Sequence, residues 1–307
     1  MLRSAVVALA LLAGVVAVNA ESSHAARNPS AYQQQIQRWR ADRVGRLTAP
    51  DGWLSLIGLE WLKPGANRIG SAVDNDIVLK AGPAHLGTVT LGVDGGLHLR
   101  LLAGSGATVD GKAVSDASLI DDLHAGADTP PTLVRFGTVN FYVIDRDGRK
   151  ALRVKDSDAA TRRDFHGIDY FPIDASWHIV ADWVPFDPPH TLEIGTAIGT
   201  IDKVAVPGKA VFHRDGHSYE LLPYQEEPGG DLFFVIADRT SGKQTYGAAR
   251  FLHAALPRDG KVVLDFNEAY NPPCAFTPFA TCPLAPPENR LDMSVTAGEK
   301  KYLGEPH

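Results

Sequence analysis

The stretch Thr88-Val-Thr-Leu-Gly-Val-Asp-Gly-Gly-Leu-His-Leu-Arg-Leu101 decides the fold class. Apolar residues alternate with other residues on both sides of Asp94-Gly-Gly96, and a period of two places one set of side chains on one face of a strand. Asp-Gly and Gly-Gly pairs favour tight hairpin turns because they accept positive φ. The stretch therefore predicts a β-hairpin with one buried face.

The same pattern continues along the chain. Val139, Phe141 and Val143 alternate before a turn at Asp145–Gly148. Further short strands are predicted at Ile179–Val184, Leu192–Ile194, Ala210–His213, Tyr219–Leu222, Leu232–Ala237, Tyr246–Phe251, Val262–Phe266 and, as the last strand, Leu291–Val295. The 307 residues include 29 glycines and 21 prolines, which indicates many turns. Regular short strands with turns between them are typical of a sandwich or barrel.

One helix is predicted, over residues 30–47. The residues that recur at helical spacing are Tyr32, Ile36, Trp39, Val44 and Leu47. Ser30 and Gln33 fit a capping box at its start. A charged stretch at Asp156–Arg163 is the best boundary later in the chain. We therefore predict a mainly β protein with two sandwich-like or barrel-like halves, residues 30–155 with the N-terminal α-helix and residues 164–303.

Residues 1–20 have the features of a secretory signal peptide. Arg3 precedes the apolar run Ala5–Val18, and Val18-Asn-Ala20 is a small-residue cleavage site. The run is shorter than the roughly 20 residues of a membrane helix, and an uncleaved N-terminal anchor is the alternative. We expect an exported protein, periplasmic or secreted, that begins at Glu21 and has no membrane span after signal removal.

Charge and motifs exclude several functions. The formal net charge is −6, so the chain has no overall positive charge for binding nucleic acid. It contains no Gly-x-Ser-x-Gly elbow, no His-Glu-x-x-His pair and no phosphate-binding glycine loop followed by lysine. We therefore predict no nucleic-acid partner, no cofactor and no metal site.

The two cysteines, Cys274 and Cys282, lie in one proline-rich segment. An oxidising compartment favours a disulfide between them, and closing so short a loop stabilises a fold by about 2–3 kcal/mol. A zinc site is the alternative, although a second pair of ligands is not recognisable. The sequence favours the disulfide.

Two family resemblances are present. The Ile69-Gly70 pair, the segment Asp74–Leu79 and Val109-Asp-Gly111 resemble forkhead-associated domains over residues 65–114. In those domains an arginine after Ile-Gly binds phosphothreonine, whereas this chain has Ser71 there. The resemblance implies a β-sandwich and not phosphopeptide binding.

The second resemblance covers nearly the whole mature chain, from about Tyr32 to Tyr302. The segments that carry it are Trp53–Leu62, Gly65–Gly70, Asp238–Gly242, Thr245–Tyr246, Arg250–Leu252, Asp265–Asn267, Asn271–Thr277, Cys282–Pro283, Glu288–Leu291 and Ala297–Glu299. They are similar to the domain-of-unknown-function family numbered 1684 (DUF1684), with its Asn-Pro-Pro-Cys-Ala-Phe-Thr motif. The resemblance implies no reaction, because the family has no established catalytic residues. Members without an export signal also carry both cysteines, which weakens the compartment argument for a disulfide.

Polar residues gather between Asp238 and Arg290, at predicted strand ends and in proline-containing loops. The candidate ligand-binding residues are Asp238, Arg239, Thr240, Tyr246, Arg250, Asp265, Asn267, Asn271, Glu288, Asn289 and Arg290. Loops fixed by proline hold polar side chains at low entropic cost, as a binding pocket requires. The same residues also satisfy turn backbones and form ion pairs in proteins without a ligand.

Two functions follow from this cluster. The first is a binding or structural module for a small molecule or a component of the cell envelope. The alternative is a hydrolase in which Asp265 or Glu288 is the general base and Arg250 or Arg290 is the electrostatic stabiliser. We also predict that Asp238, Arg250, Asp265 and Arg290 share one hydrogen-bonded network, because the strands before Asp238 and Asn267 are expected to be neighbours.

Overall fold

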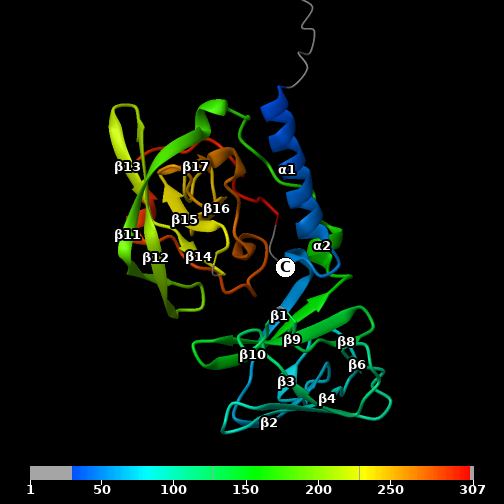
Figure 1. Ribbon diagram of the computed structural model, residues 1–307. Helices are drawn as coiled ribbons and strands as arrows, with labels where there is room; N and C mark the ends of the chain where they lie inside the picture. The colour runs from blue at the N-terminus through cyan, green and yellow to red at the C-terminus, as the bar shows by residue number, and fades with distance from the viewer. Residues whose placement is uncertain (1–29, 127, 228, 305–307) are drawn as a thin grey trace, which may run out of the picture.

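The computed structural model describes residues 30–126, 128–227 and 229–304 (Figure 1). It confirms a mainly β protein with several sheets, 43% strand and 14% helix. The predicted signal peptide lies outside the described residues. No helix within the described residues is long and apolar enough to cross a membrane.

Helix α1 (Ala31–Thr48) confirms the predicted N-terminal helix. The Ser30 side chain accepts a hydrogen bond from the Gln33 N–H, and the Gln33 side chain accepts one from the Ser30 N–H, so the capping box is present. The shorter helical segments are α2 (Ala160–Arg163), η1 (Trp53–Ser55), η2 (Ala175–Trp177), η3 (Phe266–Glu268), η4 (Pro273–Ala275) and η5 (Pro287–Asn289).

The N-terminal half contains two five-stranded sheets, ordered β1-β10-β9-β8-β6 and β3-β2-β4-β5-β7. The predicted hairpin is confirmed as β4 and β5, in which Leu91 pairs with Leu97. The strands are β1 (Leu56–Trp61), β2 (Gly65–Gly70), β3 (Ile77–Val78), β4 (Gly87–Leu91), β5 (Leu97–Leu101), β6 (Thr108–Val109), β7 (Asp116–Leu119), β8 (Val134–Phe136), β9 (Val139–Arg146) and β10 (Arg149–Asp156). Val89 and Leu99 of one sheet share a core with Phe141 and Leu152 of the other.

The C-terminal half contains a four-stranded sheet, β13-β12-β11-β17, and a smaller one, β14-β15-β16, in which β18 pairs with β15 in parallel. The strands are β11 (His178–Gly195), β12 (Ile201–Arg214), β13 (His217–Leu221), β14 (Tyr224–Gln225), β15 (Leu232–Asp238), β16 (Arg250–Ala254), β17 (Lys261–Asp265) and β18 (Arg290–Leu291). Phe234 on one face of β15 packs with Trp177 and Phe212, whereas Phe233 on the other face packs with Phe251. Strand β15 is therefore buried on both faces.

Several predicted strands differ in the structure, and the one predicted at Tyr246–Phe251 is β16, at Arg250–Ala254. The strands predicted at Ile179–Val184 and Leu192–Ile194 are one strand, β11, because its pairing with β12 resumes at His190 after an irregularity that begins at Pro185. The last strand is only Arg290–Leu291, shorter than predicted.

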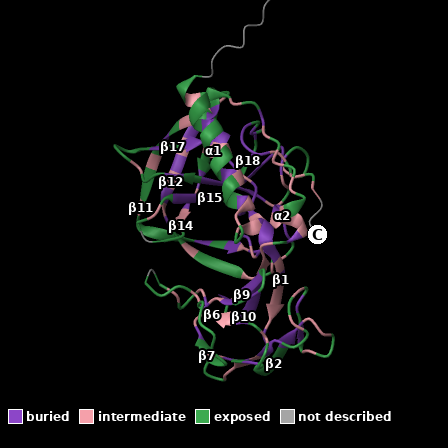
Figure 2. Ribbon diagram, turned by 90° about the vertical axis from the view of Figure 1, so that its right-hand side faces the viewer, coloured by how far each residue is buried: buried purple, intermediate pink, exposed green. Residues whose placement is uncertain are grey.

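Helix α1 makes its polar contacts with the C-terminal half, although we grouped it with residues 30–155. The Arg43 Nε lies 3.0 Å from Glu299 Oε1, and the Tyr32 hydroxyl donates to Asp265. Figure 1 shows the helix beside the C-terminal sheets, and Figure 2 shows that its outer face is largely exposed. The chain then passes into the N-terminal half and returns through α2.

Candidate functional site

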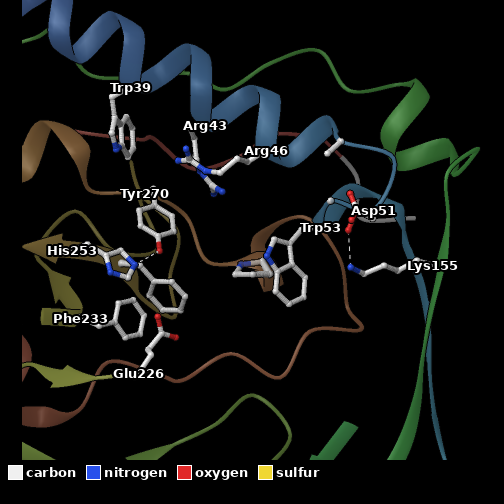
Figure 3. Close-up of a pocket in the computed structure, with 14 residues that line it drawn as sticks. Trp39, Arg43, Arg46, Asp51, Trp53, Lys155, Glu226, Phe233, His253 and Tyr270 are labelled. Carbon is white, nitrogen blue, oxygen red and sulfur yellow. Dashed lines mark hydrogen bonds between the residues drawn. The ribbon is translucent and has the colours of Figure 1, made fainter. Parts of the chain in front are cut away.

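A cleft of about 630 Å³ lies where α1, the segment after it, the end of β10 and the β14-β15-β16 sheet meet (Figure 3). The residues that line it are Trp39, Arg43, Arg46, Ala49, Asp51, Gly52, Trp53, Lys155, Glu226, Phe233, Phe251, His253, Tyr270 and Pro273. Residues from five stretches of the sequence, 39–53, 155, 226–233, 251–253 and 270–273, therefore build one site.

Aromatic side chains form one wall. Phe233 on β15 is the cross-strand partner of His253 on β16, and their rings stack with centroids 4.8 Å apart. Phe251 lies two residues before His253, so the two side chains share a face of the strand. Tyr270 follows η3, and its hydroxyl lies 2.9 Å from His253 Nε2. The wall is continuous because Tyr270 also meets Phe251 edge to face at 5.7 Å.

Helix α1 supplies the opposite wall. Trp39, Arg43 and Arg46 are spaced four and three residues apart, so they share one helix face. Arg43 is buried; besides its ion pair with Glu299, its Nη2 donates to the Asn271 carbonyl at 2.8 Å. Its guanidinium also lies 4.6 Å from the Tyr270 ring centroid. Arg43 thus links the helix to the aromatic wall, and its charge is offset by Glu299.

The remaining wall comes from the segment after α1 and from β10. Trp53 lies in η1, and the Lys155 Nζ donates to the Asp51 carbonyl at 2.6 Å. Behind Trp53 lies the buried Arg153 guanidinium, 5.3 Å from the Trp53 ring centroid. The N-terminal half therefore contributes positive charge to this side of the cleft.

Two titratable groups on the aromatic side have shifted pKa values. Loss of surrounding water raises the pKa of Glu226, and repulsion from Glu227 adds to it. Desolvation lowers the pKa of His253, and the nearby positive charge of Arg46 acts in the same direction. Both residues are exposed by surface area, so solvent weakens these shifts. The aromatic side therefore favours uncharged forms.

None of the eleven candidate residues from the sequence lines this cleft. Asp238, at the end of β15, and Arg250, at the start of β16, bind each other: Arg250 Nη2 donates to Asp238 Oδ2 at 2.7 Å. Arg250 also donates to the carbonyls of Val295 and Ala297. Both side chains are almost completely buried. This carboxylate and this arginine therefore converge on each other and not on an open cleft.

Asp265 and Asn267 form a separate network with α1. Asp265 accepts hydrogen bonds from the Tyr32 hydroxyl at 2.9 Å, and its Oδ2 lies 2.9 Å from His178 Nδ1. The Asn267 amide donates to the Tyr32 hydroxyl at 2.8 Å. The predicted single network of Asp238, Arg250, Asp265 and Arg290 is therefore wrong.

The physical reason is the sheet order. Strand β15, which ends at Asp238, pairs with β14, β16 and β18, whereas β17, which ends at Asp265, pairs with β11. The two strand ends belong to different sheets and do not deliver their polar residues to one rim.

The other candidate residues divide into buried and exposed groups. Thr240 and Asn271 are buried, Asn289 exchanges two hydrogen bonds with the Leu222 backbone, and the Tyr246 hydroxyl donates to the Cys274 carbonyl. These contacts hold loops in place. Three exposed residues, Arg239, Glu288 and Arg290, line a second hollow of about 630 Å³ beside β13.

The predicted disulfide is absent, because Cys274 and Cys282 are free thiols. The backbone N–H of Cys274 donates to Cys282 Sγ at 3.2 Å, so the two residues lie side by side without an S–S bond. A hydrogen bond from the Cys282 thiol lowers the pKa of Cys274 and raises the pKa of Cys282 itself. Within the described residues, no group of three or more potential metal ligands is present.

Glu268 gives a testable pH dependence beside the Asp265 network. Burial, and then repulsion from Asp265, raises the pKa of Glu268 to about 7, against the effect of His178. The folded state therefore binds this proton more tightly than the unfolded chain, and stability falls as the pH rises from the ordinary glutamate pKa to about 7. We expect Glu268→Gln to raise the free energy of unfolding by about 1–2 kcal/mol at pH 8, allowing for solvent screening.

At pH 4 the same substitution should change little, because the carboxyl is then protonated in both states. Urea denaturation at both pH values measures the difference. An equal effect at pH 4 and pH 8 would contradict the titration of Glu268.

Sequence reasoning missed every residue of the cleft as a functional group. A signal was present in two places. Trp39, Arg43 and Arg46 lie on one face of a correctly predicted helix, and Phe251 ends the strand predicted at Tyr246–Phe251, which in the structure continues past His253 to Ala254. The sequence does not show that these two faces meet.

Residues 163–300 match the family model of DUF1684, described as a protein of unknown function. An uncharacterized protein of Haloarcula marismortui, solved in solution by NMR, is 30% identical; the match covers 47% of this chain and 81% of that one, with a TM-score of 0.40. A crystal structure of Rad53 residues 1–466 with AMP-PNP is 10% identical over 72% of this chain and 50% of that one, with a TM-score of 0.18. No curated protein matches. The family match does not include residues 65–114, where the forkhead-associated resemblance stays a prediction.

Proposed function

We propose that this chain, which belongs to the DUF1684 family through residues 163–300, binds a small organic molecule in the cleft beneath α1. The function of that family is unknown, so the cleft itself is the basis of the proposal. The observation that carries this proposal is the convergence of Trp39, Trp53, Phe233 and Tyr270 on one open cleft. Aromatic rings with a few polar groups at their edges are the usual lining of ligand sites.

The size and construction of the cleft support binding. Its volume of about 630 Å³ lies within the roughly 300–1,000 Å³ of small-molecule sites. Its aromatic wall is held by backbone pairing of β15 with β16 and by the Tyr270 hydrogen bond to His253, so the rings are positioned before a ligand arrives. A preformed site loses less conformational entropy on binding.

The hydrolase alternative has less support. Arg250 is committed to Asp238, and Asp265 accepts from Tyr32 and lies at hydrogen-bond distance from His178. Glu288 and Arg290 share the second hollow, but the Arg290 Nη2 donates to the Ala285 carbonyl. The four residues named for catalysis thus do not form one acid–base site.

The proposed ligand belongs to the cell envelope or to the medium, since we also propose that the protein is exported. The features of residues 1–20 support this part of the proposal. N-terminal sequencing of the exported protein should begin at Glu21. Material that retains Met1 would contradict cleavage.

Filling the cleft tests the proposed function. Ala49 lines the cleft at the end of α1, and Ala49→Trp places a bulky ring in it without removing a polar contact. We expect the mutant to bind the uncharged fluorescent probe N-phenyl-1-naphthylamine at least about 10-fold more weakly, a loss of about 1.4 kcal/mol. Fluorescence titration measures both dissociation constants.

The matched control is Ala41→Trp, which adds the same ring to an exposed position of the same helix. It should bind the probe as the wild type does, and both variants should keep the wild-type circular dichroism spectrum. Equal affinity of the wild type and Ala49→Trp would refute binding in this cleft.

A further inference from the structure

Two charged side chains of opposite sign line the cleft without an ionic partner. Among the described residues, the side chains of Arg46 and Glu226 make no hydrogen bond and no ion pair. Figure 3 shows Arg46 on the helix side and Glu226 below the aromatic wall, with Tyr270, His253 and Phe233 between them. The two charges are held apart by the rings and do not neutralise each other.

The helix side of the cleft, taken together with the adjoining wall from the segment after α1 and β10, has an excess of positive charge. Arg43 is offset by the buried Glu299, whereas the Lys155 Nζ donates to the neutral Asp51 carbonyl and forms no ion pair with any described residue. Behind Trp53, the buried Arg153 guanidinium donates to the hydroxyls of Tyr142 and Thr281, and within the described part of the chain its Nε has no hydrogen-bond partner. The Asp51 carboxylate is the one acidic group among the lining residues of this side. Here an anionic group would gain charge-assisted hydrogen bonds.

The aromatic side offers a hydrogen-bond acceptor instead. Glu226 follows β14 directly and lines the cleft on the same side as Phe233 and His253. It has no cation within ion-pair distance among the described residues, and loss of surrounding water raises its pKa. A donor on the ligand would restore the interaction that the carboxylate loses with water.

Resting on the proposed function, we infer that the ligand is a small ring compound with a carboxylate or phosphate at its Arg46 end and an amine or hydroxyl donor at its Glu226 end. The rings of Trp39, Phe233 and Tyr270 would contact its apolar body. The two ends would fix the orientation of the ligand, because its anionic group would meet Arg46 and its donor would meet the Glu226 carboxylate.

Three probes built on one ring test the two ends separately. 4-(Aminomethyl)benzoate carries both groups, 4-methylbenzoate the anion only, and 4-methylbenzylamine the amine only. We expect calorimetric titration to show that the first binds at least about 10-fold more tightly than either of the others. A fourth probe, 4-methylphenyl phosphate, carries a phosphate in place of the carboxylate of 4-methylbenzoate. Whichever of these two probes binds more tightly identifies the anionic group of the ligand as a carboxylate or a phosphate.

Two variants assign the ends. Arg46→Ala should weaken binding of 4-methylbenzoate and leave binding of 4-methylbenzylamine unchanged. Glu226→Gln should weaken binding of 4-methylbenzylamine and leave binding of 4-methylbenzoate unchanged. The matched controls are Arg38→Ala, an exposed arginine of the same helix outside the cleft, and Glu227→Gln, next to Glu226 and also outside it.

The outcomes separate this inference from the proposed function. If N-phenyl-1-naphthylamine responds to Ala49→Trp but the three ring probes bind equally, the cleft binds small molecules and the inferred ligand class is wrong. Equal effects of Arg46→Ala and Arg38→Ala on the benzoates would also overturn it. If no probe responds to Ala49→Trp, the proposed function itself fails.

Discussion

Replacing Asp238 by alanine should lower the free energy of unfolding by about 3–5 kcal/mol, because it leaves the guanidinium of Arg250 buried without its counter-charge. Both side chains are at most 1% exposed, and the Arg250 Nε already has no hydrogen-bond partner. Asp238 also accepts from the N–H groups of Thr240 and Val295, so its loss frees two buried donors as well. Urea denaturation monitored by circular dichroism measures the change.

The double substitution Asp238→Leu with Arg250→Met is the control for this pair. It removes both charges and fills the space with apolar groups, so it should recover part of the stability lost by Asp238→Ala. A loss below about 1 kcal/mol for Asp238→Ala would contradict the buried ion pair and place it among exposed pairs.

Replacing Glu299 by alanine should have an effect of similar size, about 3–5 kcal/mol, and should in addition release α1. Glu299 is fully buried; it binds Arg43 of the helix, and its Oε2 accepts from the Asn271 N–H at 2.7 Å. Its loss leaves Arg43 buried without a counter-charge at the helix–sheet contact. Trypsin should then cleave within α1 faster than in the wild type, as followed by mass spectrometry.

An exposed ion pair is the control for Glu299→Ala. Asp292 pairs with Arg239 at 2.7 Å, but both side chains are more than half exposed. Asp292→Ala should therefore lower the free energy of unfolding much less than Glu299→Ala and leave cleavage in α1 unchanged. If the two substitutions had equal effects, burial of the Glu299 pair would not govern the attachment of the helix.

Much of the fold follows from local sequence. The hairpin of β4 and β5 depends on the alternation of apolar residues and on an Asp-Gly-Gly turn. The start of α1 depends on a capping box. Both signals lie within a few residues of the element that they predict. Within β11 the sequence predicts two separate strands, whereas in the structure the pairing with β12 resumes at His190, beyond Pro185, Pro188 and Pro189. Which half receives α1 depends on side chains about 250 residues away, and no local pattern contains that information.

The candidate site was predicted less well than the fold. Asp238, Arg250, Asp265 and Asn271 are polar residues in rigid surroundings, as expected, but the structure uses them to fasten β15, α1 and neighbouring loops. The cleft instead takes its aromatic residues from α1, η1, β15, β16 and the segment after η3. In the sequence these residues cannot be told from core residues, because a ring that lines a cleft and a ring that fills a core have the same spacing.

The docking of α1 has a consequence for the order in which this protein folds. The helix is synthesised before every strand, yet the groups that hold it, Asp265, Asn271 and Glu299, are among the last to be made. A contact between Arg43 and Glu299 closes almost the entire chain, and such long-range contacts form late. The helix can therefore form its Tyr32 and Arg43 contacts only after Asp265, Asn271 and Glu299 have been synthesised, and the cleft beneath it is completed late. A chain truncated before Glu299 would lack the counter-charge of Arg43 and should hold the helix over the cleft less firmly.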